Sequence, residues 1–404
     1  MNYKLFFTQK VDKIKLENRY REFVELVRDA ENFPYAFYTP NSSKIILWCI
    51  NDYLGMSRNP LVVNAAVKAL QDMGVGSGGT RNICGSHILI NELERLLATL
   101  HNKDKALVFT SGYVANDATL TSLAQIIPGL IYFSDEANHA SIIQGIKRSG
   151  AEKYIYKHNN TEDLRNLLKS VDINKPKIIV FESVYSMDGI ISPISDICLL
   201  AKEFNTFTYL DEVHSVGLYG SRGGGIAQEL GVEDELDIIQ GTLAKGFGSI
   251  GGYIAAKDYV IDAIKSIASG FIFTTSLPPS IVAASIESIK ILMTSLELRA
   301  RHKEMVALTK AALSENNIEF VKNDSHIISI IIGDPTITKQ VSSILLNRYN
   351  IYIQHINFPT VPMGTERLRI TPTPFHSVVM IQELAASLKQ VFDELGLFAK
   401  LKGA

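Results

Sequence analysis

Lys245 is the residue of this chain whose surroundings most clearly indicate covalent chemistry. It lies in GTLAKGF, among small residues and three positions after Thr242, at the end of the apolar run 236–243. An ammonium group near an apolar pocket or other cations loses proton affinity, so its free amine can attack carbonyl groups and act as a base. A nucleotide-binding GxxxxGK[ST] loop is the rival interpretation, but Phe247 stands where that loop requires lysine. We therefore expect Lys245 to form a Schiff base, with Thr242 able to hydrogen-bond a phosphate.

Asp211 and His214 form a second candidate cluster, in TYLDEVHSVGLYG, where an apolar run ends just before a glycine-rich turn. A buried carboxylate at such a position needs a partner. A pyridine nitrogen is one, because an aspartate facing it keeps it protonated, and the ring then draws electrons from a carbanion on a bound amino acid. His214 could reach a phenolic oxygen on the same ring. Taken alone, DEVH is equally compatible with a strand-end cluster of mutually satisfied polar groups.

Two further motifs lie at expected strand ends. In TSGYVAND, residues Ser111, Gly112 and Tyr113 leave a strand and enter a helix whose first backbone amides are unpaired, an arrangement that favours an anion. An ordinary strand-to-helix turn has the same appearance. In SDEANHAS, the imidazole of His139 could lie flat on a cofactor ring and assist proton transfer, although many strand-end histidines have no such role.

Seven apolar, β-branched runs alternate with stretches of helical periodicity, which predicts an α/β fold. Because the runs are polar only at their C-terminal ends, we expect a mostly parallel sheet, covered on both faces, that binds ligands at those ends. The runs lie at residues 106–112, 130–135, 153–158, 177–183, 207–212, 236–243 and 251–256.

The pattern changes near residue 285 to long amphipathic helices followed by strand-like segments at 325–333 and 368–374. A chain of 404 residues is too long for one simple domain. We therefore expect an N-terminal helical arm at 1–45, a large catalytic domain at 46–285 and a smaller α+β domain at 286–404.

Composition narrows the class of protein. With 40 basic and 42 acidic residues, the net charge of -2 provides no excess with which to bind nucleic acid or an anionic membrane. Cys49, Cys84 and Cys198 lie too far apart for a metal cluster, so no metal is expected. Without a signal peptide or a membrane-spanning run, the sequence predicts a soluble, cytoplasmic protein. A mean hydropathy of +0.10 hints that a second copy covers some apolar surface.

Taken in order, SGY, NHAS, DEVH and TLAK resemble the α-oxoamine synthase branch of the pyridoxal-phosphate-dependent transferases, from about residue 20 to residue 390. Six segments resemble most specifically the 5-aminolevulinate synthases of that branch: NDYLGM, GSGGTRNICG, FESVYSMDG, DEVHSVGLYG, FIFTTSLPP and PTVPMGTERLRITPTP. The resemblance implies a fold of the aspartate aminotransferase type I class and pyridoxal 5'-phosphate as cofactor. It also implies glycine and succinyl-CoA as substrates and a homodimer with active sites at the subunit interface.

The resemblance also assigns roles to residues. It implies Lys245 as the Schiff-base lysine, Asp211 at the pyridine nitrogen and His139 stacked on the ring. It further implies His214 at the phenolic oxygen, with Ser186 and Thr242 as additional cofactor contacts. Thr274 and Thr275 would reach the cofactor phosphate of the neighbouring subunit. The helix start at Ser111, Gly112 and Tyr113 is expected to bind the cofactor phosphate.

Substrate recognition requires groups that grip carboxylates, and arginine does so with both oxygens at once. The resemblance matches Arg369 to the glycine carboxylate and Arg21 to the terminal carboxylate of succinyl-CoA. Asn51, Thr80, Asn82 and Thr360 correspond to other substrate-binding positions, and Lys153 to the CoA end. Either arginine could instead form an ordinary surface ion pair.

Alternatives remain at the sequence level. Related enzymes, such as 2-amino-3-ketobutyrate CoA ligase and 8-amino-7-oxononanoate synthase, use other acyl donors or amino acids. A non-catalytic subunit with the same fold would lack Lys245. The sequence departs from the family pattern at Ile90, where histidine is usual, and at Met363, where arginine is commoner.

Overall fold

The structure is a computed structural model that describes residues 1–398 as two compact units. The large unit comprises Asn51–Ser186 and Ile190–Ala300. The small unit comprises Met1–Ile50, Met187–Gly189 and the described chain from Arg301 onward. The division at residue 300 comes later than the boundary expected at residue 285, which falls within helix α11 (Pro279–Thr294).

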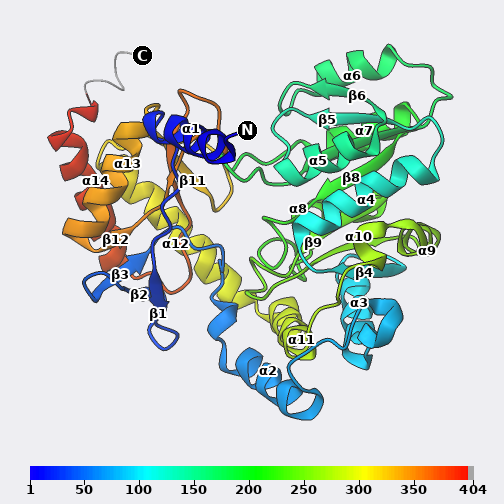
Figure 1. The fold of residues 1–404 in the computed structure, drawn as a ribbon, viewed down its shortest axis with the longest axis horizontal. Coiled ribbons are helices and arrows are strands. Elements are labelled where there is room, and N and C mark those ends of the chain that lie inside the picture. Colours follow the sequence, from blue (N-terminus) through cyan, green and yellow to red (C-terminus); the bar gives the residue numbers. More distant parts are fainter. Residues whose placement is uncertain (399–404) are drawn as a thin grey trace. The chain divides into compact units, whose positions relative to one another are not determined.

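A seven-stranded sheet forms the centre of the large unit (Figure 1). Its strand order is β4 (Lys105–Phe109), β10 (Gly252–Ala256), β9 (Ile238–Thr242), β8 (Phe207–Asp211), β7 (Lys177–Glu182), β5 (Ile131–Asp135) and β6 (Glu152–Tyr156). Among these described strands, β10 alone runs antiparallel to its neighbours, and the other pairs are parallel. The expectation of a mostly parallel sheet is confirmed.

Helices cover both faces of this sheet. Because successive residues of a strand point to opposite faces, the packing of β10 shows which helices lie on each face. On β10, Tyr253 and Ala255 belong to one hydrophobic cluster and Ile254 and Ala256 to another. The first cluster contains residues of α2 (Pro60–Met73), α3 (Ile88–Leu100) and α11; the second contains residues of α4 (Gly112–Ile126), α5 (Ala140–Ser149), α9 (Asp258–Ile267) and α10 (Ser269–Ile272). The other helices of the large unit are α6 (Thr161–Lys169), α7 (Ile194–Glu203) and α8 (Ile226–Leu230).

Polar N-caps start the two helices that carry candidate site residues. Ser111 caps α4, and its side chain accepts a hydrogen bond of 3.1 Å from the backbone N–H of Val114. His139 caps α5, and its ring nitrogen accepts from the backbone N–H of Ser141. Because α4 follows β4 and α5 follows β5, both caps lie at the C-terminal edge of the sheet.

The small unit contains two sheets and their covering helices. One sheet has the order β1 (Leu26–Arg28), β2 (Tyr35–Tyr38), β3 (Ser43–Leu47) and β12 (Ile351–Tyr352), and the other has the order β11 (Ile328–Ile331), β14 (Arg367–Ile370) and β13 (His355–Ile356). Its core combines β11 and β14 with α13 (Pro335–Tyr349), α14 (Val378–Glu394) and part of α12 (Leu296–Glu315), a helix that crosses the division between the units.

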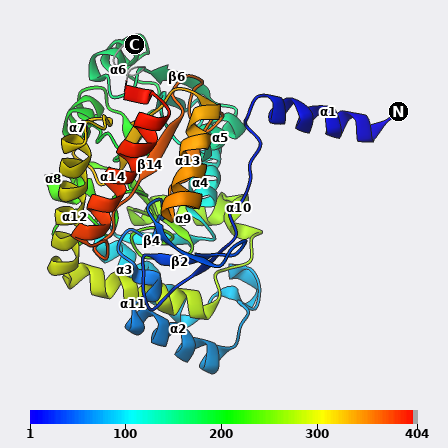
Figure 2. The same cartoon turned by 90° about the vertical axis from the view of Figure 1, so that its left-hand side faces the viewer.

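The N-terminal segment differs in part from the helical arm expected at residues 1–45. Only α1 (Tyr3–Leu16) is an α-helix there, and β1, β2 and most of β3 occupy later positions. Burial alternates along β2, where Ala36 is buried and Phe37 is exposed, which is the period of a strand. No residue of α1 is buried, and Figure 2 shows the helix extending away from the strands of its own unit. None of the described helices is long and apolar enough to cross a membrane.

Candidate active site

Lys245 lies three residues beyond the end of β9, at the C-terminal edge of the large sheet. Its Nζ is 2.9 Å from Nε2 of His214, and Nδ1 of His214 is 2.8 Å from the hydroxyl of Tyr53. Both partners are buried, so they hold the lysine amine at a defined point. The turn after Lys245 requires glycine, because a Cβ on Gly246 would lie 2.3 Å from the carbonyl oxygen of Val216.

Asp211 ends β8 with its carboxylate buried and held from two sides. Its Oδ2 accepts a hydrogen bond of 2.8 Å from Asn116, and its Oδ1 accepts one of 2.8 Å from the backbone N–H of Val213. Burial raises the pKa of Asp211, whereas these two hydrogen bonds and the charge of Lys245 lower it. A buried carboxylate with this support is suited to face a cationic ring nitrogen.

His139 presents a neutral imidazole to the same pocket. Burial lowers its pKa below the ordinary 6.5, the charge of Lys245 lowers it as well, and Asp211 acts in the opposite direction. Its Nδ1 is 2.7 Å from the hydroxyl of Ser141, which in turn accepts a hydrogen bond from Asn116. The ring orientation is therefore linked to the residue that holds Asp211.

The N-terminus of α4 forms another wall of this pocket. Gly112, Tyr113 and Thr242 line it, and Ser111 is the helix cap. The first turn of α4 lies against β10 so closely that a Cβ on Gly252 would be 2.4 Å from the backbone nitrogen of Gly112. Glycine at 252 thus lets the helix N-terminus, which favours anions, reach the edge of the sheet.

These residues fit pyridoxal phosphate in their chemistry. One pocket is lined by an amine on Lys245 that can hold an aldehyde, a buried carboxylate on Asp211 that can hold a protonated ring nitrogen, and the N-terminus of a helix of 15 residues that can hold a phosphate. The structure brings together Gly112, Tyr113, His139, Asp211, His214, Thr242 and Lys245 from the sequence-based set.

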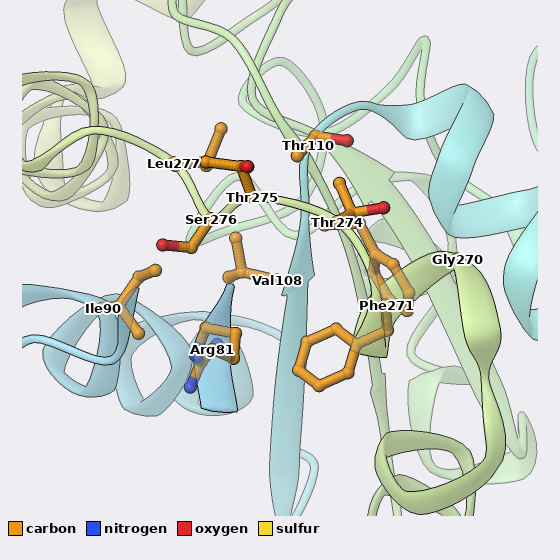
Figure 3. Close-up of a pocket in the computed structure, with 11 residues that line it drawn as sticks. Arg81, Ile90, Val108, Thr110, Gly270, Phe271, Thr274, Thr275, Ser276 and Leu277 are labelled. Carbon is orange, nitrogen blue, oxygen red and sulfur yellow. The ribbon is translucent and has the colours of Figure 1, made fainter. Parts of the chain in front are cut away.

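A second pocket of the large unit contains the two threonines expected to act on a neighbouring subunit. Thr274 and Thr275 line it together with Arg81 and Phe271 (Figure 3). Thr275 forms an isolated β-bridge with Thr80. The segment FTTSLPP, which contains Thr274 and Thr275, therefore lies beside the segment GGTRN. Arg81 is committed to a two-pronged ion pair with Glu94, at 2.7 and 3.1 Å.

Arg369, Arg21 and Thr360 lie in the small unit. Arg369 is buried on β14 opposite Ser329 of β11. Arg21 and Thr360 line one pocket of that unit, together with Tyr20 and His355, although 339 positions separate them in the sequence. Two residues expected to bind substrate therefore line one pocket of the small unit.

The remaining sequence-based residues lie in the large unit. Asn51 accepts a hydrogen bond of 3.3 Å from the hydroxyl of Tyr53, which places it next to the His214 chain. Asn82 lies in the short helical turn Arg81–Gly85 after Thr80 and is exposed. Ser186 is half-buried beyond β7. Lys153 is exposed on edge strand β6, and neither Ser186 nor Lys153 is among the described residues that line the Lys245 pocket.

Sequence reasoning missed five residues of the Lys245 pocket and its surroundings: Tyr53, Asn116, Ser141, Glu182 and Val213. Each lies inside a motif that had been recognised for another residue. Asn116 carried a detectable signal, since it is a polar residue among the buried residues of α4. Glu182 carried one too, as a carboxylate at the C-terminal end of a continuous apolar strand.

The fold and site define the class to which the protein belongs. The family model described as aminotransferase class I and II matches residues 43–388, and the chain belongs to this family. Among curated relatives, the 5-aminolevulinate synthase of Rickettsia prowazekii (strain Madrid E) is 59% identical over 395 residues, covering 98% of this chain and 95% of the relative. The 5-aminolevulinate synthase of Bradyrhizobium diazoefficiens is 49% identical over 404 residues, covering 100% of this chain and 99% of the relative.

Solved structures agree with this assignment. Serine palmitoyltransferase from S. paucimobilis, with bound PLP and myriocin, matches with a TM-score of 0.90 at 28% identity, covering 97% of this chain and 98% of that one. The resemblance to the 5-aminolevulinate synthases and the expected type I transferase fold are both confirmed.

Proposed function

We propose that this chain catalyses the decarboxylative condensation of glycine with succinyl-CoA to 5-aminolevulinate, CoA and carbon dioxide, the first step of heme and tetrapyrrole biosynthesis. The observation that carries this proposal is the amine of Lys245, 2.9 Å from His214 in one pocket with the buried carboxylate of Asp211. Identity of 59% over 98% of the chain to a relative named 5-aminolevulinate synthase supports this reaction over others of the family.

The pocket would hold pyridoxal phosphate, which supplies, when bound, an aldehyde that joins amines and a ring that withdraws electrons from the substrate α-carbon. Lys245 would hold the aldehyde of the cofactor through its amine. When free, the same amine would act as the base that takes a proton from the α-carbon of glycine and as the acid that returns one. Asp211 would hold a protonated ring nitrogen, His214 would hold the phenolic oxygen, and His139 would support the face of the ring.

The phosphate end of the cofactor site uses Ser111, Gly112, Tyr113 and Thr242, with Ser186 as a further cofactor contact. In this proposal Thr274 and Thr275 of one subunit bind the phosphate held by its partner, so the enzyme is a homodimer with active sites at the interface. The exposure of Thr275 supports this role. The exposed aromatic side chains of α1, with Phe7 73% accessible, support a second copy as their cover.

Substrate recognition divides between two arginines. Arg369 binds the glycine carboxylate, and Arg21 binds the terminal carboxylate of succinyl-CoA. The pocket that Arg21 shares with Thr360, a further substrate-binding residue, supports this role. The residues Asn51, Thr80 and Asn82 contact the succinyl chain, and Lys153 contacts the CoA end.

The test is an assay of the purified protein with four substrate pairs: glycine with succinyl-CoA, glycine with acetyl-CoA, alanine with pimeloyl-CoA, and serine with palmitoyl-CoA. We expect the highest kcat/KM with glycine and succinyl-CoA, and no turnover by Lys245→Ala with any pair. A higher kcat/KM with another pair would assign the protein to a different α-oxoamine synthase, such as 2-amino-3-ketobutyrate CoA ligase or 8-amino-7-oxononanoate synthase. Equal rates for the variant and the parent would remove Lys245 from the mechanism.

A further inference from the structure

Glu182 is a second buried carboxyl group in the Lys245 pocket, and the proposed reaction leaves it without a role. It ends β7, is 2% exposed, and lines the pocket with Asp211 and His139. Glu182 and Asp211 are register partners in the parallel pair of β7 and β8, so both side chains start from the same face of the sheet. Two carboxyl groups this close and this buried are expected to differ in charge, because two adjacent negative charges would repel each other.

The contact that Glu182 makes is with the backbone of His139. Its Oε1 accepts a hydrogen bond of 2.5 Å from the His139 N–H, at the first residue before α5. The backbone nitrogen is one bond from the Cα that carries the imidazole. Ser141 fixes the rotation of that ring through Nδ1 at 2.7 Å, so Glu182 and Ser141 together fix its place and its orientation.

The surrounding charges indicate which of the two carboxyl groups stays ionised. Burial raises the pKa of Glu182 well above its ordinary value, and Asp211 and Asp135 raise it further, while the His139 N–H and Lys245 lower it. Asp211 instead receives hydrogen bonds on both of its oxygens. The negative charge is therefore favoured on Asp211, and Glu182 is the carboxyl group that is more readily protonated.

We propose that Glu182 is a positioning residue, whose carboxyl oxygen holds the backbone of His139 and thereby the imidazole at the pocket wall, through a hydrogen bond and without a negative charge. The inference rests on the proposed function in one respect, that the His139 ring lies against pyridoxal phosphate. Glutamine at position 182 preserves the acceptor and is neutral, whereas alanine removes it.

A double-mutant cycle tests this assignment. The dissociation constant of pyridoxal phosphate, followed by visible absorbance, is measured for the parent, Glu182→Ala, His139→Ala and the double variant. Loss of one buried hydrogen bond predicts about tenfold weaker binding for Glu182→Ala. The same substitution should have no effect once the imidazole is gone. Glu182→Gln should bind within about twofold of the parent, since it keeps the acceptor.

Ser192→Ala is the matched control, because the Ser192 hydroxyl donates to the backbone oxygen of Glu182 at 2.7 Å and leaves its side chain in place. It should lower thermal stability without weakening cofactor binding. Equal weakening by Glu182→Ala with and without the His139 imidazole would overturn the proposal, because Glu182 would then act elsewhere. Glu182→Gln as damaging as Glu182→Ala would show that the charge is required and would also overturn it.

A readout without cofactor separates this inference from the proposed function. In cofactor-free protein labelled at histidine, the His139 ring resonance is identified by its loss in His139→Ala. It should shift in Glu182→Ala and stay in place in Glu182→Gln, and an unshifted resonance in Glu182→Ala would refute the positioning role. If the parent protein bound no pyridoxal phosphate, the proposed function would fail while this spectrum still tested Glu182.

Discussion

Asn116→Ala would remove the side chain that holds the carboxylate of Asp211. The Asn116 Nδ2 donates to Asp211 Oδ2 at 2.8 Å, and its Oδ1 accepts from the Tyr209 hydroxyl at 2.7 Å. Burial raises the pKa of Asp211, and the hydrogen bond from Asn116 is the largest interaction that lowers it. Without this donor the charged carboxylate is less stable, so the pKa of Asp211 rises further.

The size of the effect follows from that hydrogen bond. A hydrogen bond to a charged group contributes about 1.5–3 kcal/mol, which corresponds to a loss of about 10- to 150-fold in kcat/KM for glycine. The acidic limb of the pH profile should also move to higher pH, since a carboxyl group of raised pKa ionises only there. The buried Tyr209 hydroxyl loses its acceptor, which lowers the free energy of unfolding by about 1–3 kcal/mol.

Steady-state kinetics across the pH range, with chemical unfolding of the same preparations, would measure both effects. Ser122→Ala is the control, because the Ser122 hydroxyl lies on the same helix and donates within it, to the carbonyl of Ala118 at 2.6 Å. It should lower stability and leave the pH profile unchanged. An Asn116→Ala protein with the parent's kcat/KM and the parent's acidic limb would show that Asn116 does not maintain the charge of Asp211.

Three other predictions address the substrate, the dimer and the small unit. Arg21→Leu should raise the KM for succinyl-CoA about tenfold or more while the KM for glycine changes little, and equal changes in both would contradict the donor role. Lys245→Ala and Thr275→Ala proteins, mixed and reassembled, should regain activity because one of the two sites in a mixed dimer is intact; no gain on mixing would place Thr275 in its own subunit's site. Burial lowers the pKa of His302 to about 4 and of His376 to about 3 from 6.5, so the unfolded chain takes up these protons first as the pH falls. The free energy of unfolding measured in urea should therefore be about 2 kcal/mol lower per histidine at about pH 5 than above pH 6.5. Identical urea midpoints at neutral and acidic pH would argue against this.

The sequence predicted the central sheet well because its strands are continuous apolar runs buried on both faces. Residues 207–212 were expected as a strand and β8 is Phe207–Asp211. The antiparallel direction of β10 could not be predicted, since the run at 251–256 contains nothing that specifies its neighbours. The strands near the N-terminus were also missed, because β1 has three residues and β2 has four, too few for a clear alternation.

The site was partly predictable, because parallel strands bring their C-terminal ends to one edge. That rule places Lys245, Asp211 and His139 in one pocket, as the structure does. It cannot find Tyr53, which reaches His214 from 161 residues earlier in the chain and does not end a strand of the sheet. It also cannot find the bond between Glu182 and His139, since that contact depends on side-chain direction.

The two residues that depart from the family pattern lie in a hydrophobic core and on the protein surface. Ile90 is 1% exposed in the core of the large unit, where an apolar side chain packs among α3 and its neighbours. Met363 is 69% exposed in the small unit, so a thioether in place of a charged side chain there alters the exposed surface of that unit. Neither residue lines the Lys245 pocket within the described chain.

Trapping of the cofactor on Lys245 would show whether this lysine forms the Schiff base. The purified protein would be supplied with pyridoxal phosphate, reduced with borohydride, digested and examined by mass spectrometry. We expect one modified lysine, in the peptide that contains Lys245, and no modification there when borohydride is omitted. An unmodified Lys245 peptide, or a cofactor adduct confined to another lysine, would contradict this expectation.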